Sequence, residues 1–295
     1  MLDIVIVNYE STDYLIRCLE SLYTSVKDTP VNVFVQDNNS TDGLERVCAG
    51  FPQVRLTKNV KNLGFAKAVN RVLTECKAPF TLILNPDTVA IDGCFESILE
   101  YMQNQPDVGI VGPRILDADG SIQGSARSFP NFVTALFGRN SILTRFWPNN
   151  PISRRSILSS KSDGKTPMEV DWVSGACMVV RKEAWAEVGG LDDRFFVYWE
   201  DVDWCKRMWE RGWRVVYFPE ANIMHNIGGS SAKKPLRSIL EFHRSCYRFI
   251  NKHGNGLLKF MNPIVIGALS VRLAVTVLLN RMGRWSSRWL SRKEE

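Results

Sequence analysis

The sequence lacks the paired cysteines that hold structural metals or build a disulfide framework. Seven cysteines are scattered singly along the chain: Cys18, Cys48, Cys76, Cys94, Cys177, Cys205 and Cys246. An odd, scattered set predicts reduced thiols in the cytosol. The N-terminus lacks a basic segment, an apolar run and a small-residue cleavage site, so a secretory signal peptide is not expected. We therefore predict a cytoplasmic protein.

Nucleic-acid binding is not expected of the main body of the chain, because its charge has the wrong sign. From residue 233 onward there are 13 Lys or Arg and 3 acidic residues, while residues 1–232 hold 24 basic and 28 acidic residues. A weakly acidic body offers nucleic acid no basic face. The basic C-terminal segment predicts an anionic surface as its own partner.

The chain is rich in short apolar runs that alternate with helical patterns. "DIVIVNY" and "VNVFVQD" predict buried strands, and apolar residues at helical spacing run from about Thr12 to Val26. Such alternation indicates parallel βαβ units that bind ligands at the carboxyl ends of their strands. At 295 residues and 45% hydrophobic content, the chain suits one large domain, with or without an appendage.

Polar clusters follow three successive predicted strands, at residues 8–10, 37–42 and 85–87. Any one cluster is accounted for by turn formation and helix capping. Three together favour a ligand site. The stretch "KNLGFAKAVN" places Gly64 at a turn, but it has neither the GxGxxG nor the GxxxxGK[ST] spacing, so it supports neither a dinucleotide site nor a P-loop.

The second half of the chain predicts more strands around one irregular span. Residues 108–120 indicate a strand and hairpin, and about 148–167 an irregular loop rich in Ser, Arg, Lys and Pro. Residues 171–192 predict a strand, a short helix and a Gly-Gly turn. Residues 213–226 predict a pair of strands that carries His225.

Three acids are crowded among large aromatic residues in "FFVYWEDVDWCKRMWERGW". Burial of Glu200 and Asp201 beside such rings raises a carboxyl pKa, which suits a general base. The alternative is a pair of helix N-terminal acids favoured by the helix dipole. Asp203 lies about 200° from Asp201 around a helix and is expected to form an ion pair with Arg207, four residues on.

These stretches together carry a resemblance. "IVIVNYES", "VQDNNSTDG", "KNLGFAKAVN", "NPDT", "VSGACMVVRKEAWAEVGGLDDRFFVYWEDVDWCKR" and "HNIGGSS" resemble family 2 glycosyltransferases, most of all bacterial rhamnosyltransferases that build surface polysaccharide. The resemblance covers about residues 2–231. It implies an α/β GT-A fold, Rossmann-like, whose mixed, mainly parallel sheet is flanked by helices. It places the catalytic domain at 1–232, followed by a basic, amphipathic helical appendage at 233–295.

The resemblance also implies an inverting transfer of a sugar from a nucleotide-sugar donor, dTDP-rhamnose being favoured over a UDP- or GDP-sugar, with Mg²⁺ or Mn²⁺ as cofactor. The donor-binding positions that it implies are Val7, Asn8, Tyr9, Glu10, Asp37, Asn39, Asn62, Gly64, Asn70 and Asn85. Asp37 would accept the imide N–H of the base, and helix capping competes for Asn62 and Asn70. The family's Asp-x-Asp reads "NPD" here, and an amide is a weaker ligand than a carboxylate, so the metal is expected mainly at Asp87. The resemblance also implies a role for His225, which matches a late histidine of the family near the diphosphate or metal, against the alternative of a structural histidine.

The catalytic base implied by the resemblance is Asp201, with Glu200 orienting the acceptor. Trp172, Tyr198 and Trp199 would form a stacking floor for a sugar ring, against the alternative that they are core residues. Arg127 is a further candidate for acceptor binding, against the alternative of a surface arginine. The acceptor is expected to be a lipid-linked glycan.

The C-terminal appendage predicts contact with an anionic membrane through residues 257–295. "NPIVIGALSVRLAVTVLLN" is apolar but carries Arg272 near its centre, which disfavours a spanning helix. Basic residues follow at helical spacing, with Trp285 and Trp289 among them, as suits the headgroup region on the inner face of the cytoplasmic membrane. The alternative is a helix that covers the catalytic domain or joins two subunits of a homo-oligomer.

Two other functions fit a related fold. A nucleotidyltransferase would need a loop rich in Gly and Lys after the first strand, and "VNYESTDYL" contains neither residue. A catalytically impaired glycan-binding or scaffold protein is left open by Asn85.

Overall fold

The computed structural model describes residues 1–26, 29–130, 134, 147, 150–226, 235–254 and 262–291. These form two compact units, Met1–Phe129 with Ile157–Lys233 (unit one) and Pro130–Ser156 with Lys234–Glu295 (unit two). Several predicted features lie outside the described residues: 148–149 of the irregular loop, 227–231 of the last motif, 257–261 of the tail and Arg292, together with the side chains of Trp285 and Trp289.

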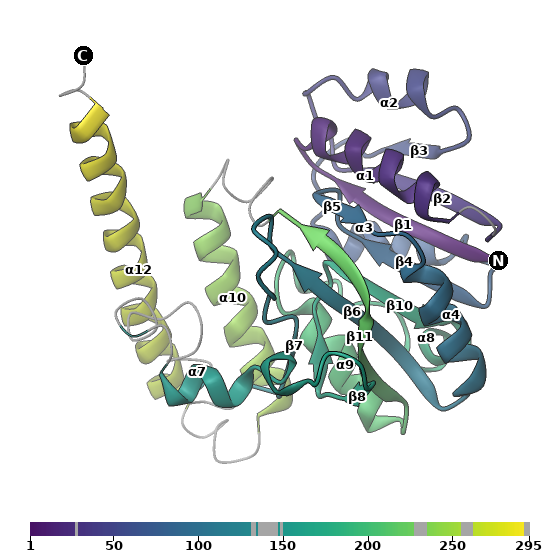
Figure 1. The fold of residues 1–295 in the computed structure, drawn as a ribbon. Helices are drawn as coiled ribbons and strands as arrows, with labels where there is room; N and C mark the ends of the chain where they lie inside the picture. The colour runs from purple at the N-terminus through teal and green to yellow at the C-terminus, as the bar shows by residue number, and fades with distance from the viewer. Residues whose placement is uncertain are drawn as a thin grey trace. The chain divides into compact units, whose positions relative to one another are not determined.

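Unit one is built on a mixed sheet (Figure 1). In the described residues its order is β3-β2-β1-β4-β10-β6-β11-β5, with β8 paired to β11. The strands are β1 (Leu2–Asn8), β2 (Val31–Asp37), β3 (Arg55–Lys58), β4 (Phe80–Leu84), β5 (Thr88–Ala90), β6 (Val108–Leu116), β8 (Met168–Glu169), β10 (Cys177–Arg181) and β11 (Arg214–His225). Strands β1 to β4 are parallel to one another, whereas β10 runs antiparallel to both β4 and β6.

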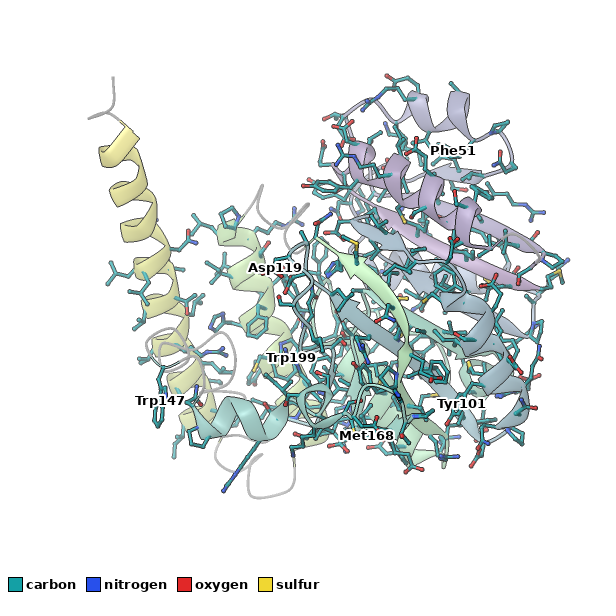
Figure 2. All side chains as sticks on the ribbon, viewed as in Figure 1. Phe51, Tyr101, Asp119, Trp147, Met168 and Trp199 are labelled. Carbon is teal, nitrogen blue, oxygen red and sulfur yellow. The ribbon has the colours of Figure 1, made fainter. Side chains whose placement is uncertain are left out.

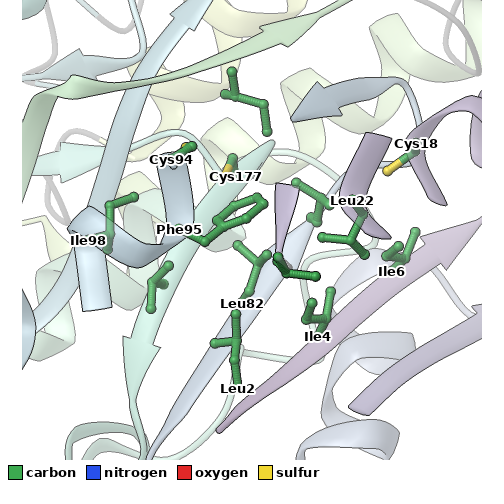
Figure 3. Packing of buried hydrophobic residues seen from close by; sticks show 14 of the residues in the cluster. Leu2, Ile4, Ile6, Cys18, Leu22, Leu82, Cys94, Phe95, Ile98 and Cys177 are labelled. Carbon is green, nitrogen blue, oxygen red and sulfur yellow. The ribbon is translucent and has the colours of Figure 1, made fainter. Parts of the chain in front are cut away.

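The helices of unit one cover both faces of this sheet. They are α1 (Thr12–Ser25), α2 (Glu45–Gly50), α3 (Phe65–Leu73), α4 (Cys94–Asn104), α8 (Lys182–Val188) and α9 (Glu200–Glu210). Alternate residues of β1 point to opposite faces: Ile4 joins the core formed with α1 and α4 (Figure 3), and Val5 joins the core formed with α3 and α9. The predicted helix from about Thr12 and the strands at 3–9 and 31–37 are therefore confirmed.

The predicted strand pair at 213–226 is wrong, because β11 is one continuous strand. Its pairing with β6 shifts register between Phe218 and Asn222. Pro219 has no N–H to donate, so a bulge interrupts the ladder without ending the strand. This long strand carries His225 to the edge formed with β5.

The predicted irregular span at 148–167 contains short helical turns in its described part. These are α7 (Pro151–Ser156) and the 3₁₀ turn η1 (Ser159–Lys161). The single strand predicted within residues 171–192 is two strands, β9 (Trp172–Val173) and β10, and the predicted short helix is α8. Strand β9 pairs antiparallel with β7 (Ala126–Arg127) in a separate two-stranded sheet.

Unit two contains α10 (Pro235–His253) and the long helix α12 (Asn262–Ser291), which pack on each other. The guanidinium carbon of Arg272 lies 5.3 Å from the centre of the Phe242 ring of α10, a cation–π contact. Only 9% of Arg272 is exposed, whereas Val271 and Leu278 of the same helix are 66% and 56% exposed. The one charge within residues 262–280 is thus turned toward α10.

Candidate active site

The crowded acids Glu200, Asp201 and Asp203 lie in the first turn of helix α9, as the helix-dipole alternative predicts. Tyr198 and Trp199 precede it with φ values of 67° and 71°, in the left-handed region that non-glycine residues rarely adopt. Trp199 is labelled in Figure 2. The N–H of Asp203 donates to the carbonyl of Trp199 across 2.9 Å and closes the first turn. Two consecutive strained residues cost energy, and such backbone is found where function fixes a conformation.

Asp201 is held by backbone donors. Its Oδ2 accepts the N–H of Gly175 at 2.9 Å, and its Oδ1 accepts the N–H of Val202 at 2.9 Å. Burial raises the pKa of Asp201, and these N–H groups together with the Arg127 guanidinium oppose that rise. The raised pKa expected of a general base is therefore present.

Glu200 is the more deeply buried partner of the pair, with 6% of its surface exposed. Its Oε2 has no hydrogen-bond partner among the described residues. Burial, and then the neighbouring charge of Asp201, raise the pKa of Glu200 to about 8. At neutral pH Glu200 therefore retains its proton more readily than an exposed glutamate does.

The third acid, Asp203, stabilises the fold through an ion pair. It is fully buried, and its Oδ2 accepts a 2.8 Å hydrogen bond from Nε of Arg207. Arg207 also donates to the carbonyl oxygens of Val188 and Gly190. The predicted ion pair is confirmed, and it anchors α9 to the loop after α8.

Asp87 and His225 lie together, as the sequence predicted for a metal site. His225 Nε2 is 3.2 Å from Asp87 Oδ1, and the antiparallel pairing of His225 with Thr88 fixes this approach. Asn85 precedes them at the end of β4, half-buried, and its side chain makes no hydrogen bond to a described residue. No group of three or more His, Cys, Asp or Glu suited to a metal occurs in the described residues.

Asp201 and the Asp87–His225 pair are connected through one short backbone segment. Asn85 donates its N–H to the carbonyl of Ala176 across 2.9 Å, and the preceding residue, Gly175, donates to Asp201. Asp201 is thus linked to the strand end that carries Asn85 and Asp87. The predicted general base, Asp201, and the predicted metal ligand, Asp87, therefore lie at the same edge of the sheet.

The polar cluster after β2 is a closed hydrogen-bond network. Asp37 is fully buried; its Oδ1 accepts from Asn8 Nδ2 at 2.9 Å and from the Ser40 hydroxyl, and its Oδ2 accepts the Ser40 N–H at 2.8 Å. Glu10 accepts from Thr41. Asp37 therefore orders the loop in this structure, and its predicted contact with a base stays a prediction.

Backbone with positive φ shapes this region. Glu10 and Asn39 have φ values of 52° and 66°. Val7 and Asn8 end β1 as buried residues, and Tyr9 is half-buried beside Glu10. The donor positions implied at the end of β1 and after β2 are thus adjacent in space, since Asn8 and Asp37 share a hydrogen bond.

Gly64 is confirmed as a turn, with φ of 85°. The group that approaches it closely is protein backbone: a Cβ there would lie 2.4 Å from the carbonyl oxygen of Phe196. Asn62 Oδ1 accepts the Gly64 N–H at 2.9 Å. Asn70 bonds both backbone groups of Leu191. These contacts brace the loop before Tyr198, and contact of Asn62 or Asn70 with a nucleotide stays a prediction.

Two of the implied acceptor residues meet. Arg127 pairs with Trp172 across β7 and β9, and its guanidinium carbon lies 5.5 Å from the Trp172 ring centre. Trp172 Nε1 donates to the Ser128 carbonyl at 3.0 Å. Trp172 and Tyr198 are half-buried, whereas Trp199 is 9% exposed. Their stacking on a sugar stays a prediction.

Three residues of this site were missed in the sequence. Ser40 joins the Asp37 network, Gly175 fixes the base, and Gln123 contacts His225 with its Oε1 3.2 Å from Nδ1. Gly175 and Ser40 fall inside motifs that were recognised. Gln123 follows the hairpin after β6 and has no local pattern that marks it.

The comparisons with known proteins fit this geometry. The sequence profile described as "Glycosyltransferase like family 2" matches residues 2–240. The chain belongs to this glycosyltransferase-like family 2. An N-acetylglucosaminyl-diphospho-decaprenol L-rhamnosyltransferase of Mycobacterium tuberculosis is 33% identical over 268 residues, 87% of this chain and 86% of the relative. The dTDP-rhamnosyl transferase RfbF of Shigella flexneri is 23% identical over 292 residues, 94% and 89% of the two chains.

Solved structures show the fold of this glycosyltransferase to be GT-A. The mannosyltransferase PcManGT from Pyrobaculum calidifontis, in complex with GDP-Man and Mn²⁺, matches with a TM-score of 0.58 at 16% identity, over 97% of this chain and 80% of that one. GalNAc-T7 with UDP, GalNAc and Mn²⁺ gives 0.56 at 14% identity, over 77% and 43%. The predicted enzyme class, GT-A fold and similarity to bacterial rhamnosyltransferases are confirmed.

Proposed function

We propose that this enzyme transfers L-rhamnose from dTDP-rhamnose, with inversion, to a hydroxyl of a lipid-linked glycan in surface-polysaccharide synthesis. The observation that carries the reaction type is the link from Asp201 through Gly175 and Ala176 to the strand end bearing Asp87. The donor and acceptor classes are supported by the names of two relatives, a dTDP-rhamnosyl transferase and an N-acetylglucosaminyl-diphospho-decaprenol L-rhamnosyltransferase.

Asp201 is the general base of this reaction. Its carboxylate takes the proton of the acceptor hydroxyl while that oxygen attacks the anomeric carbon, and the bond from that carbon to dTDP breaks with its electron pair leaving on the diphosphate. The raised pKa of Asp201 makes it a stronger base than an exposed aspartate. Glu200, mainly protonated at neutral pH, leaves Asp201 as the single charge and orients the acceptor.

Asp87 and His225 would hold a divalent cation, because Asp87 Oδ1 and His225 Nε2 face each other 3.2 Å apart. A cation bound there would neutralise the charge that develops on the diphosphate leaving group. Asn85 contributes a neutral amide oxygen at the same strand end.

The donor nucleotide lies against the ends of β1 and β2, and the acceptor sugar lies against Trp172 and Arg127. The Asp37 network supports this assignment, because it fixes the loop that would line the base. The Arg127–Trp172 pair supports the acceptor side, because a partly exposed ring held by a cation offers a flat apolar surface to a sugar.

The C-terminal helix attaches the enzyme to the inner face of the cytoplasmic membrane, where a lipid-linked acceptor is found. Asn262–Arg281 is long and apolar enough to cross a membrane by length and composition, with a mean hydropathy of 1.8. The inward position of Arg272 and the exposed apolar residues of α12 support contact with lipid instead of water.

Thermal shift with a panel of nucleotide sugars tests the donor. We expect dTDP-rhamnose with Mn²⁺ to raise Tm more than UDP- or GDP-sugars, and Mn²⁺ to accelerate release of dTDP. Stabilisation by another donor alone would reassign the sugar, and stabilisation by none would overturn donor binding. Donor turnover that is lost in Asp201→Asn separates an enzyme from a glycan-binding protein of the same fold.

A further inference from the structure

Gln123 is a buried polar residue beside the proposed cation pair. It is 7% exposed and follows the hairpin after β6, where its N–H donates to the Ile115 carbonyl across 2.8 Å. The backbone is thereby fixed next to β11. Its side-chain amide lies within hydrogen-bond distance of three groups.

The orientation of the Gln123 amide is determined by its partners. Nε2 donates to the carbonyl oxygen of His225 at 2.8 Å and to Oδ1 of Asp117 at 2.8 Å. A carbonyl oxygen cannot donate, and a carboxylate accepts. With the amide turned over, its oxygen would face two acceptors, so the NH₂ group belongs on that side.

The remaining atom of the amide, Oε1, faces Nδ1 of His225 at 3.2 Å. An amide oxygen only accepts, so the hydrogen bond requires the proton on Nδ1. Nε2 of neutral His225 then carries its lone pair and points to Asp87 Oδ1, 3.2 Å away. Two acceptors face each other, and a cation between them satisfies both.

We propose that Gln123 is a positioning residue that selects the Nδ1–H tautomer of His225 and so presents Nε2 to the divalent cation. The cation site itself rests on the function proposed above. Without the Gln123 acceptor, His225 protonates Nε2 instead and donates to Asp87 directly. That hydrogen bond must be broken before a cation binds, and losing a partner of this kind typically weakens metal affinity by about 10- to 100-fold.

The tautomer can be measured without the metal, by ¹⁵N-detected NMR of the imidazoles at about pH 8.5, above the usual histidine pKa near 6.5. The chain has three histidines, and His225→Gln identifies the relevant signals. We expect Nδ1–H for His225 in the native protein and a shift toward Nε2–H in Gln123→Met. Gln36→Met, a replacement of another buried glutamine on β2, is the control and leaves the tautomer unchanged.

Mn²⁺ affinity in the presence of dTDP, measured by electron paramagnetic resonance, is the second readout. Gln123→Met should weaken it about 10- to 100-fold, and Gln36→Met should leave it unchanged. A native Nε2–H tautomer would overturn the Gln123 proposal alone. Unchanged Mn²⁺ affinity in His225→Gln would overturn the cation site instead.

Discussion

The backbone N–H of Gly175 donates to Oδ2 of Asp201 across 2.9 Å, and a Cβ at Gly175 would lie 3.3 Å from the Asp201 Cβ. Helix α9 and the segment before β10 are therefore in close contact at the base. Because the donor is a backbone group, the position of the carboxylate depends on the path of the chain. The same segment bonds the end of β4 through Ala176, so Asp201 and the strand end that carries Asp87 are positioned together.

Asp201 and Asp203 are two residues apart, but their replacement should affect different properties: the rate of transfer for Asp201 and the stability of the fold for Asp203. Asp201→Asn keeps one acceptor oxygen, for either the Gly175 or the Val202 N–H, and removes the base, so we expect transfer to fall about 10²- to 10⁴-fold with a smaller loss of stability than in Asp203→Asn. Asp203→Asn weakens the buried pair with Arg207 and should lower stability by about 3 kcal/mol. Rates and urea unfolding of both variants check this. Equal loss of activity in two equally stable variants would contradict the assignment.

The raised pKa of Glu200 predicts a pH-dependent stability. In the unfolded chain this carboxyl releases its proton near its ordinary value of 4.5, whereas in the folded protein it retains the proton to about 8. Between these values the folded state binds more protons than the unfolded state, so the free energy of unfolding falls as pH rises. The stabilisation that comes from the protonated Glu200 carboxyl is fully present only below about pH 4.5.

Glu200→Gln imitates the protonated form and should flatten this slope in urea unfolding from pH 5 to 8.5. Exposed Glu220→Gln is the matched control and should keep the native slope. An unchanged slope in Glu200→Gln would mean that the proton is not held at this carboxyl.

Gly64 should be more sensitive to a side chain than another glycine with the same backbone. Gly64 and Gly120 have φ values of 85° and 81°, but a Cβ at Gly64 meets the Phe196 carbonyl at 2.4 Å and one at Gly120 meets nothing within 4 Å. Gly120→Ala therefore incurs only the left-handed strain, about 1–2 kcal/mol. Gly64→Ala adds an overpacking cost of about 1–3 kcal/mol and should slow transfer by displacing the loop before Tyr198. Similar stability of the two variants would argue against the contact.

The strand ends of this fold were predictable, and the contacts between distant segments were not. Apolar runs mark β1, β2 and β4, and polar residues follow them, so the positions of Asn8, Asp37 and Asp87 could be predicted from local pattern. The antiparallel insertion of β10 between β4 and β6 has no local signal, because it depends on long-range pairing. Gln123 was missed for the same reason: it acts on His225 across 102 residues.

Some polar residues that the sequence analysis assigned to ligand binding instead form hydrogen bonds within the protein. The Asn70 amide bonds Leu191 and Asp193, and the Asp37 carboxylate is enclosed by Asn8 and Ser40. A sequence shows that such groups need partners but not whether protein or ligand supplies them.

Replacement of Asn85 by aspartate should tighten cation binding. The change restores the acidic residue that the family commonly has here and adds a charged oxygen ligand beside Asp87, so we expect Mn²⁺ affinity to rise about tenfold in paramagnetic resonance titrations. Without metal, the two carboxylates repel, so Asn85→Asp should also lose stability that Mn²⁺ restores. Asn104→Asp, which adds the same charge at the exposed end of α4, is the control and should change neither the Mn²⁺ affinity nor the stability without metal. Unaltered affinity in Asn85→Asp would place the cation away from this strand end.

The exposed side of α12 should determine membrane attachment. Val271 is 66% exposed next to Arg272, which faces α10. Val271→Glu therefore places a charge where we propose contact with lipid, and it should abolish most sedimentation with anionic liposomes. Deletion of residues 257–295 should have the same effect. Val60→Glu adds the same charge at a 93% exposed valine of unit one and should sediment like the native chain. Because attachment is proposed to be peripheral, alkaline carbonate should release the native protein. Resistance to carbonate would indicate a spanning helix, and undiminished binding of both altered chains would mean that another surface meets the membrane.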